Sequence, residues 1–303
     1  MTPPSRELLT RHPANPILTW RDAPLPANAV YNPGAARVGE RTVLLLRLEN
    51  TRRDNDLHCA WSDDGITFAI ESKPIALTTP EEDLPFERHR YDARITQIGG
   101  DYFIAYCAQG FDETVRIALA KTADFKSFER IGFITEPWSR NCALFPEKIG
   151  GLWARIDRPM SGRDARNFIS LSPDLIHWGQ SRPVDLTPQT WFREKWGCGP
   201  PPIRTERGWL LIFHGVWESI APVYRLGVAL LDLKEPWRVI GQCPEFIFTP
   251  TEEWERVGEV NNCVFCNGAV VDPDGTIRVY YGAADTCIAL ATGSVKALIE
   301  ACK

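Results

Sequence analysis

The chain lacks several features that would assign it to a common class. Its formal net charge is −5, with 34 Lys and Arg against 39 Asp and Glu, so it has no basic excess for nucleic acid. No apolar run approaches the ~20 residues that a membrane-spanning helix needs. The N-terminal stretch MTPPSRELLTRHPANPILTW has no apolar signal-peptide core. We therefore expect a cytoplasmic protein that binds neither nucleic acid nor a membrane.

Cysteine is present, but its positions suggest neither a disulfide framework nor a metal site. The nine cysteines are an odd number, and Cys107 and Cys287 lie inside apolar runs, which is typical of reduced thiols in a core. Cys263 and Cys266 form one C-x-x-C pair, but a zinc site needs a second pair or two suitable histidines, and the sequence offers neither. We expect no metal and no cofactor.

Helical periodicity is scarce as well. It is clear only in GSVKALIEACK, which predicts a short helix near the C-terminus. The 24 Pro and 22 Gly separate short apolar runs, and this spacing predicts many short strands. Five units recur at roughly 50 to 70 residues, each with an apolar strand that ends in polar residues, then a second strand and a turn. Their first strands read TVLLLRLEN, DYFIAYCAQG, GLWARIDRP, GWLLIFHGVW and IRVYYGAAD.

The turns of the first three units share a pattern, seen in SDDGITF, TADFKSF and SPDLIHW. The central aspartates, Asp64, Asp124 and Asp174, can accept backbone N–H groups, and the aromatic residue that ends each turn can pack between neighbouring units. The repeat predicts an all-β fold, a five-bladed β-propeller that forms one catalytic domain over residues 1–303. A β-sandwich with accidental similarity between its strands is the alternative.

Charged residues interrupt the apolar strands at similar places. Charges there are costly unless they are paired or face water, so we interpret these strands as the innermost ones, with their polar residues at the mouth of a central channel. For each residue taken alone, a structural ion pair is the alternative. Together they supply more cations than carboxylates, which suits a polyhydroxyl substrate together with an anion. The residues that interrupt or close these strands are Arg47, Arg155, Asp157, Arg158, His214 and Asp285, and Asp92 and Lys195 add to the charges of the same site.

Long stretches of the chain resemble a known family. NPGAARVGERTVLLLRLEN, YDARITQIGGDYFIAY, RNCALFPEKIGGLWARIDRP and KWGCGPPPIRTERGWLLIFHGV look like the mannoside phosphorylases of glycoside hydrolase family 130, from about residue 11 onward. The resemblance implies a five-bladed propeller that cleaves β-mannosides with inorganic phosphate and inversion, giving α-mannose 1-phosphate. A subset of the family are hydrolases. LLDLKEP and AADTCIALA resemble the branch acting on β-1,2-linked mannose.

The resemblance also implies roles for individual residues. Asp92 of YDARI matches the family's catalytic acid, although Ala93 stands where the family usually has proline. Positions that match those holding the transferred mannose are Asn32, Arg47, Arg53, Tyr91 and Asp285. Positions that match the phosphate site are Arg140, Asn141, Arg158, Lys195 and His214.

The balance of these residues separates two reactions. Inverting hydrolysis needs a second carboxylate to activate water, whereas phosphate is already an anion and needs only cations to hold it in line. One acid opposite Arg, Lys and His therefore predicts phosphorolysis, with phosphate as co-substrate, and the resemblance implies β-1,2-mannobiose or short β-1,2-oligomannan as the substrate. A β-mannoside hydrolase with Glu49, Glu194 or Glu218 as base and a non-catalytic sugar-binding propeller are the alternatives. The sequence leaves open the linkage, the acceptor and whether the chain forms a homo-oligomer.

Overall fold

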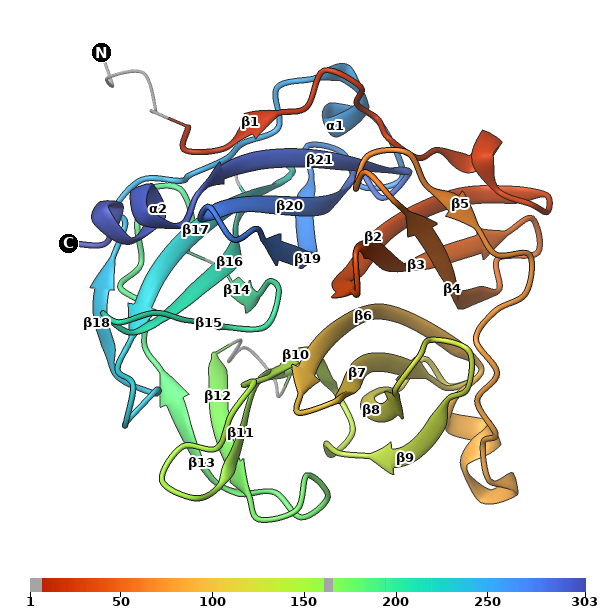
Figure 1. Ribbon diagram of the computed structural model, residues 1–303, viewed down its shortest axis with the longest axis horizontal. Helices are drawn as coiled ribbons and strands as arrows, with labels where there is room; N and C mark the ends of the chain where they lie inside the picture. Colours follow the sequence, from red (N-terminus) through yellow and green to blue (C-terminus); the bar gives the residue numbers. More distant parts are fainter. Residues whose placement is uncertain (1–6, 161–165, 194, 219) are drawn as a thin grey trace.

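Five antiparallel sheets surround a central axis (Figure 1). The computed structural model describes residues 7–160, 166–193, 195–218 and 220–303. Blade 1 contains β2 (Ala27–Val38), β3 (Arg41–Asn50), β4 (Asn55–Ser62) and β5 (Ala69–Ile70). Blade 2 contains β6 (His89–Ile98), β7 (Asp101–Gln109), β8 (Val115–Thr122) and β9 (Glu129–Phe133). Blade 3 contains β10 (Ser139–Leu144), β11 (Trp153–Pro159), β12 (Asn167–Ser172) and β13 (Gly179–Val184).

The last two blades vary this plan. Blade 4 contains β14 (Lys195–Cys198), β15 (Ile203–Arg204), β16 (Trp209–Glu218), β17 (Pro222–Leu231) and β18 (Val239–Gln242). Blade 5 contains β19 (Val264–Val271), β20 (Thr276–Ala283), β21 (Cys287–Ser294) and, from the other end of the chain, β1 (Thr10–Arg11). The predicted five-bladed, all-β propeller is confirmed, with β2, β6, β10, β14 and β19 nearest the axis (Figure 1).

Helices are few and short. They are the α-helices α1 (Glu253–Arg256) and α2 (Val295–Ala301) and the 3-10 helices η1 (Trp20–Asp22) and η2 (Glu81–Phe86). Helix α2 confirms the helix predicted near the C-terminus. No helix within the described part of the chain is long and apolar enough to cross a membrane.

The two ends of the chain close the ring. Strand β1 pairs antiparallel with β21, with Thr10 opposite Thr292 and Arg11 opposite Ala291. The Arg11 guanidinium donates to both carboxylate oxygens of the fully buried Glu255, at 2.9 and 2.8 Å. Glu255 also accepts from the Tyr281 hydroxyl of β20 at 2.8 Å, so the ion pair ties β1 to blade 5 through a satisfied buried carboxylate.

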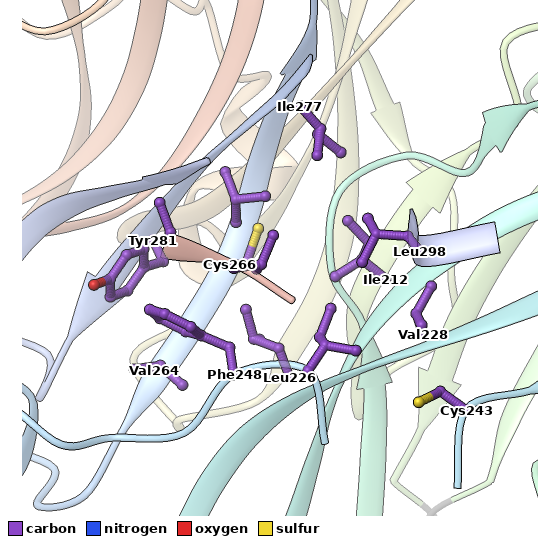
Figure 2. Packing of buried hydrophobic residues seen from close by; sticks show 14 of the residues in the cluster. Ile212, Leu226, Val228, Cys243, Phe248, Val264, Cys266, Ile277, Tyr281 and Leu298 are labelled. Carbon is purple, nitrogen blue, oxygen red and sulfur yellow. The ribbon is translucent and has the colours of Figure 1, made fainter. Parts of the chain in front are cut away.

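Apolar side chains from facing blades form the core. Between blades 4 and 5, Ile212, Leu226 and Val228 pack with Val264 and Tyr281, and Figure 2 shows how these side chains meet. Such clusters recur between the other blades, so each sheet buries both of its faces against its neighbours. The blades therefore stabilise one another around the axis.

The repeated aspartate turns have the predicted geometry. Asp64 accepts backbone N–H groups from Ile66 and Thr67 at 2.7 Å each, and Asp124 and Asp174 make the corresponding pairs of bonds in blades 2 and 3. The ring of Phe68, which ends the first turn, packs edge-on against Tyr280 of blade 5, with 5.8 Å between centroids. The turn thus fixes the end of one blade and helps join it to the next.

Candidate active site

The inner ends of the five blades enclose a cavity of about 250 Å³. Nine of the eleven residues that the sequence predicts for the site line it, and they come from all five blades. They are Asn32, Arg47, Asp92, Arg140, Asn141, Arg158, Lys195, His214 and Asp285. Segments far apart in the sequence therefore contribute to one site on the axis.

The prediction that the strands interrupted by charged residues are innermost is wrong, although β6 and β14, which carry Asp92 and Lys195, are innermost. Arg47 lies on β3 and His214 on β16, which are the second strands of their blades. Each is level with the inner strand's polar end, since Arg47 is paired with Tyr31 and His214 with Gly197. Gly197 has no side chain to block the imidazole, so His214 reaches the cavity past the inner strand. The sequence shows which strands carry charge but not their order within a sheet.

Arg155 and Asp157 belong to a different place from Arg158. The three lie on β11, where successive side chains point to opposite faces, so Arg158 reaches the cavity and the other two do not. Asp157 accepts from Arg155 at 3.0 Å and from the Ser139 hydroxyl at 2.8 Å. For this pair, the structural ion pair is the correct interpretation, and the prediction that both face the channel is wrong.

Bulges in three inner strands present polar residues to the cavity. In β2, β6 and β10 the pairing with the second strand skips two residues, of which the first is Asn32, Asp92 or Asn141, and these three residues have φ of 47°, 54° and 56°. Such left-handed backbone is uncommon for residues other than glycine, although Asn and Asp tolerate it best. A bulge re-aims one side chain without ending the strand. The same device therefore supplies one site residue from each of three blades.

One side of the cavity, the acidic half, consists of Asn32, Arg47, Asp92 and Asp285. The Asn32 amide nitrogen lies 3.1 Å from Asp92 Oδ1 and 3.5 Å from Asp285 Oδ1, so it bridges the two carboxylates. Arg47 Nη1 lies 3.7 Å from Asp92 Oδ1. Burial, followed by the charge of the neighbouring Asp92, raises the pKa of Asp285 to about 6. In this half, each charge has a partner of the opposite sign or a hydrogen bond.

A second group of lining residues, the cationic half, consists of Arg140, Asn141, Arg158, Lys195 and His214. Over the residues that the structure describes, Arg140, Arg158 and Lys195 form no ion pair, and the Nε atoms of both arginines have no hydrogen-bond partner. Burial, followed by the charges of Arg158 and Arg140, lowers the pKa of Lys195. Burial, with Arg140 adding to it, lowers the pKa of Arg158 to about 10. Among the described residues, these three cations therefore have no ion-pair partner.

Two neutral groups complete the cationic half. Burial, and then the charge of Arg158, lowers the pKa of His214 well below its ordinary value, so the imidazole is neutral at pH 7. Its Nδ1 atom has no partner among the described residues, and its ring packs against Phe265 at 4.5 Å. With its oxygen facing Arg158, Asn141 accepts from both terminal nitrogens at 3.1 and 3.2 Å. The half therefore presents donors that are already oriented.

Two predicted residues lie outside the lining of the cavity. The Tyr91 ring lies behind it, with the Arg47 guanidinium 4.3 Å above the ring and the hydroxyl 2.7 Å from Gln109. The Arg53 side chain is 65% exposed and pairs with Glu49 at 3.0 Å and with Glu259 at 3.6 Å. Tyr91 therefore supports a lining residue, and Arg53 lies toward the surface.

Of the three glutamates considered as hydrolytic bases, the two that the structure describes do not line the cavity. Glu49 pairs with Arg53 and accepts from Asn28, and Glu218 is an exposed residue at the end of β16. Glu194 lies outside the described residues. Of the described residues that line the cavity, only Asp92 and Asp285 are carboxylates, and both lie in the acidic half.

Sequence reasoning missed the less polar part of the lining. These residues carry no charge inside an apolar strand, so the pattern that identified the others does not mark them. In NNCVFCNG, attention went to the C-x-x-C spacing, whereas the structure brings the first cysteine and the phenylalanine to the cavity. The missed residues are Met160, Tyr224, Val260, Cys263 and Phe265.

All nine cysteines are buried and unpaired. No group of three His, Cys, Asp or Glu side chains that could hold a metal ion occurs in the described ranges. The cysteine pattern of the sequence therefore correctly indicated thiols inside the core.

Comparison with known proteins gives a consistent result. The profile of glycoside hydrolase family 130, described as β-1,4-mannooligosaccharide phosphorylase, matches residues 12–303. A β-1,4-mannooligosaccharide phosphorylase of Ruminococcus albus is 35% identical over 308 residues, which cover 97% of this chain and 91% of the relative. A 1,2-β-oligomannan phosphorylase of Thermoanaerobacter sp. is 38% identical over 240 residues, which cover 78% of each chain.

A solved structure agrees with these relatives. β-1,2-Mannobiose phosphorylase from Listeria innocua, in complex with β-1,2-mannobiose, superposes with a TM-score of 0.86 and 26% identity, over 97% of this chain and 98% of that one. Fold and relatives together define the class as carbohydrate-active five-bladed propellers. Within that class, the chain belongs to glycoside hydrolase family 130, the mannoside phosphorylases.

Proposed function

We propose that the protein catalyses inverting phosphorolysis of β-mannosides and releases α-mannose 1-phosphate. The observation that carries the proposal is the cationic half, where Arg140, Arg158 and Lys195 face the cavity without a counter-ion among the described residues. A phosphate dianion would neutralise much of this charge, and guanidinium groups match phosphate geometry. The names of the relatives, all phosphorylases, support the same reaction.

The two halves suggest a division of labour. We assign the transferred mannosyl unit to the acidic half, where Asn32, Arg47 and Asp285 offer donors and acceptors for sugar hydroxyls. Asp92 supplies the proton that the leaving oxygen needs, and its bulge aims the carboxyl group at the cavity. Phosphate held by the cationic half then attacks the anomeric carbon from the opposite face, which inverts the configuration. Neither a metal nor another cofactor takes part.

We propose β-1,2-mannobiose or short β-1,2-oligomannan as the substrate. Relatives with both β-1,4 and β-1,2 activities match the chain, and the β-1,2 assignment is supported by the Thermoanaerobacter relative and by the Listeria structure, which is superposed over nearly its whole length. A cytoplasmic location is part of the proposal, since nine buried cysteines without a disulfide suit a reducing compartment.

Product analysis tests this function. β-1,2-Mannobiose, β-1,4-mannobiose and β-1,4-mannosyl-glucose are each incubated with the protein, with and without phosphate, and the products are identified by ¹H and ³¹P NMR. We expect α-mannose 1-phosphate and free mannose from β-1,2-mannobiose when phosphate is present. Release of two mannose molecules in phosphate-free buffer would instead show a hydrolase. Preferential cleavage of a β-1,4 substrate would support the proposed phosphorolysis but contradict the proposed β-1,2 linkage.

A further inference from the structure

One buried cation beneath the cavity has no part in the mechanism so far. Arg94 lies on β6, two residues after Asp92, and its residue exposure is 1%. Its Nη1 donates to the Asp92 carbonyl at 3.1 Å, its Nε to the Gly199 carbonyl at 2.7 Å, and its Nη2 to the Cys198 carbonyl at 2.9 Å. Within the described ranges, it forms no ion pair.

These three bonds join two distant parts of the site. Asp92 belongs to blade 2, whereas Cys198 and Gly199 follow Lys195 directly along the inner edge of blade 4. The guanidinium therefore spans from the backbone of the proposed acid to the segment that carries a proposed phosphate ligand. Its planar fork fixes the angle as well as the distance between its partners, which a flexible ammonium does not do.

The backbone at Asp92 needs such a restraint. Its φ of 54° lies in the left-handed region, and the β6–β7 register skips from Tyr91 to Arg94, so the Asp92 carbonyl lies outside the regular ladder. Left-handed backbone at a residue other than glycine is unfavourable and persists only where its surroundings hold it. The hydrogen bond from Arg94 supplies a donor to that carbonyl.

Burial of a guanidinium to link two strands is energetically unfavourable. Taking it out of water without a carboxylate partner is unfavourable, as for any buried ion, while hydrogen bonds made by a charged group are stronger than those between neutral groups. Three such bonds offset the cost, and the charge also lies close enough to contribute to the field at His214. The unfavourable burial of Arg94 is explained if the geometry that its guanidinium fixes is needed for the reaction.

We propose that Arg94 is a positioning residue that sets the Asp92 carboxyl group relative to bound phosphate. The inference rests on the proposed phosphorolysis and extends it to a residue that does not line the cavity. Displacement of a reacting group by about 1 Å can lower a rate by ~10²-fold. Loss of the fork should therefore affect the step that needs the proton from Asp92 far more than it affects phosphate binding.

Two substrates with different leaving groups isolate that step. β-1,2-Mannobiose expels a sugar alkoxide that requires protonation, whereas 4-nitrophenyl β-mannoside expels a stable phenolate that does not. In Arg94→Lys, we expect kcat/KM for mannobiose to fall ~10²-fold and kcat/KM for the nitrophenyl substrate to fall less than ~5-fold, with a phosphate KM within ~3-fold of wild type. Asp92→Asn should show the same dependence on the leaving group.

Arg155→Lys is the matched control. Arg155 is also buried and donates to Asp157 and to the Ile134 carbonyl, but it lies away from the cavity. We expect any loss in this variant to be equal for the two substrates, because a structural defect lowers the amount of active protein without selecting a leaving group. Melting temperatures of both variants report the structural effect separately.

The outcomes distinguish this inference from the function on which it rests. Equal losses on both substrates in Arg94→Lys, or unchanged cleavage of mannobiose, would overturn the positioning role. Phosphate-independent cleavage by the wild-type protein would overturn the proposed function instead. Selective loss on mannobiose, alongside an unselective Arg155→Lys, supports both.

Discussion

The two halves of the cavity differ in whether their buried charges have partners within the protein. In the acidic half, Asn32 bridges Asp92 and Asp285, and Arg47 lies 3.7 Å from Asp92. In the cationic half, Arg140, Arg158 and Lys195 have no carboxylate partner among the described residues, and the pKa of Lys195 is lowered by burial and by its cationic neighbours. The charges of the first half are therefore compensated within the protein, whereas under the proposed function an anion would compensate those of the second.

This difference has an energetic consequence. Like charges at close range repel one another, and burial weakens the screening by water that would relieve the repulsion. A ligand that binds only the folded state stabilises it by RT ln(1 + [L]/Kd), so phosphate should raise the melting temperature of the wild-type protein. A neutral disaccharide, which adds no charge to the acidic half, should act through hydrogen bonds alone.

The largest effect is expected from the acid itself. Asp92→Asn keeps a hydrogen-bond acceptor near Asn32 but removes the proton donor, so kcat on β-1,2-mannobiose should fall by ~10²–10⁴-fold, the usual contribution of a general acid. Steady-state kinetics provide the measurement, and phosphate affinity, followed by calorimetry, should change little. Retention of wild-type kcat would exclude Asp92 as the acid.

Removal of one cation should act on the opposite half. In Arg158→Gln or Lys195→Gln we expect the KM for phosphate to rise ~10–100-fold, since a hydrogen bond to a charged group contributes about 1.5–3 kcal/mol. The KM for mannobiose should stay within ~3-fold of wild type, because neither residue lies in the acidic half. If the two KM values rise together, the division of the cavity into two halves is wrong.

A pair of glycines allows the same comparison with smaller changes. A Cβ on Gly282 would overlap the Asn32 amide, and a Cβ on Gly197 would overlap the Asn141 amide and the His214 ring. Overpacking of this kind costs about 1–3 kcal/mol, so each alanine variant should raise one KM by ~10-fold. Gly282→Ala should raise the KM for mannobiose, and Gly197→Ala the KM for phosphate. The opposite pairing would contradict the assignment of the halves.

The smallest expected effect is on stability and depends on pH. Burial and Asp92 raise the pKa of Asp285 to about 6, so the folded state binds this proton more tightly than the unfolded chain does. The group therefore stabilises the fold fully below about pH 4, and this contribution is lost as the pH rises through about 6. Asparagine imitates the protonated acid, so Asp285→Asn should melt about 2 °C higher than wild type at pH 7.5.

The sign of that change is informative. The difference in melting temperature should narrow between pH 7 and pH 5, as the wild-type carboxyl group takes up its proton. Asp63→Asn is the control, because the Asp63 side chain is 88% exposed and should show no such dependence. A lower melting temperature for Asp285→Asn at pH 7.5 would mean that the charge of Arg47 and the hydrogen bond from Asn32 outweigh the burial of Asp285.

The fold could be predicted from the sequence because the residues that define the repeat act within their own turns and strands. Asp64, Asp124 and Asp174 each organise their own turn, and the apolar strands between the turns bury both faces. Arg47, Arg158, His214 and Asp285 were noticed because charge inside an apolar strand is conspicuous, whereas Asn32, Arg140 and Asn141 were predicted only from the family resemblance. The order of the strands within a blade could not be predicted in this way. Arg47 interrupts an apolar run on a second strand just as it would on an inner strand, so the sequence pattern is the same.

Other parts of the site leave no local signal. Tyr224 and Phe265 line the cavity but resemble ordinary core aromatics in the sequence. The role of Arg94 depends on carbonyl groups about one hundred residues away, at Cys198 and Gly199. Contacts of this kind are set by the closure of the ring, so they become visible only in three dimensions.

The dependence of rate on phosphate concentration tests the central claim most directly. Initial rates of β-1,2-mannobiose cleavage are measured as phosphate is lowered to zero in a buffer without other oxyanions. If the cationic half holds the nucleophile, the rate should saturate at high phosphate and extrapolate to zero at none. A substantial rate at zero phosphate would show that water is the nucleophile and would contradict the account.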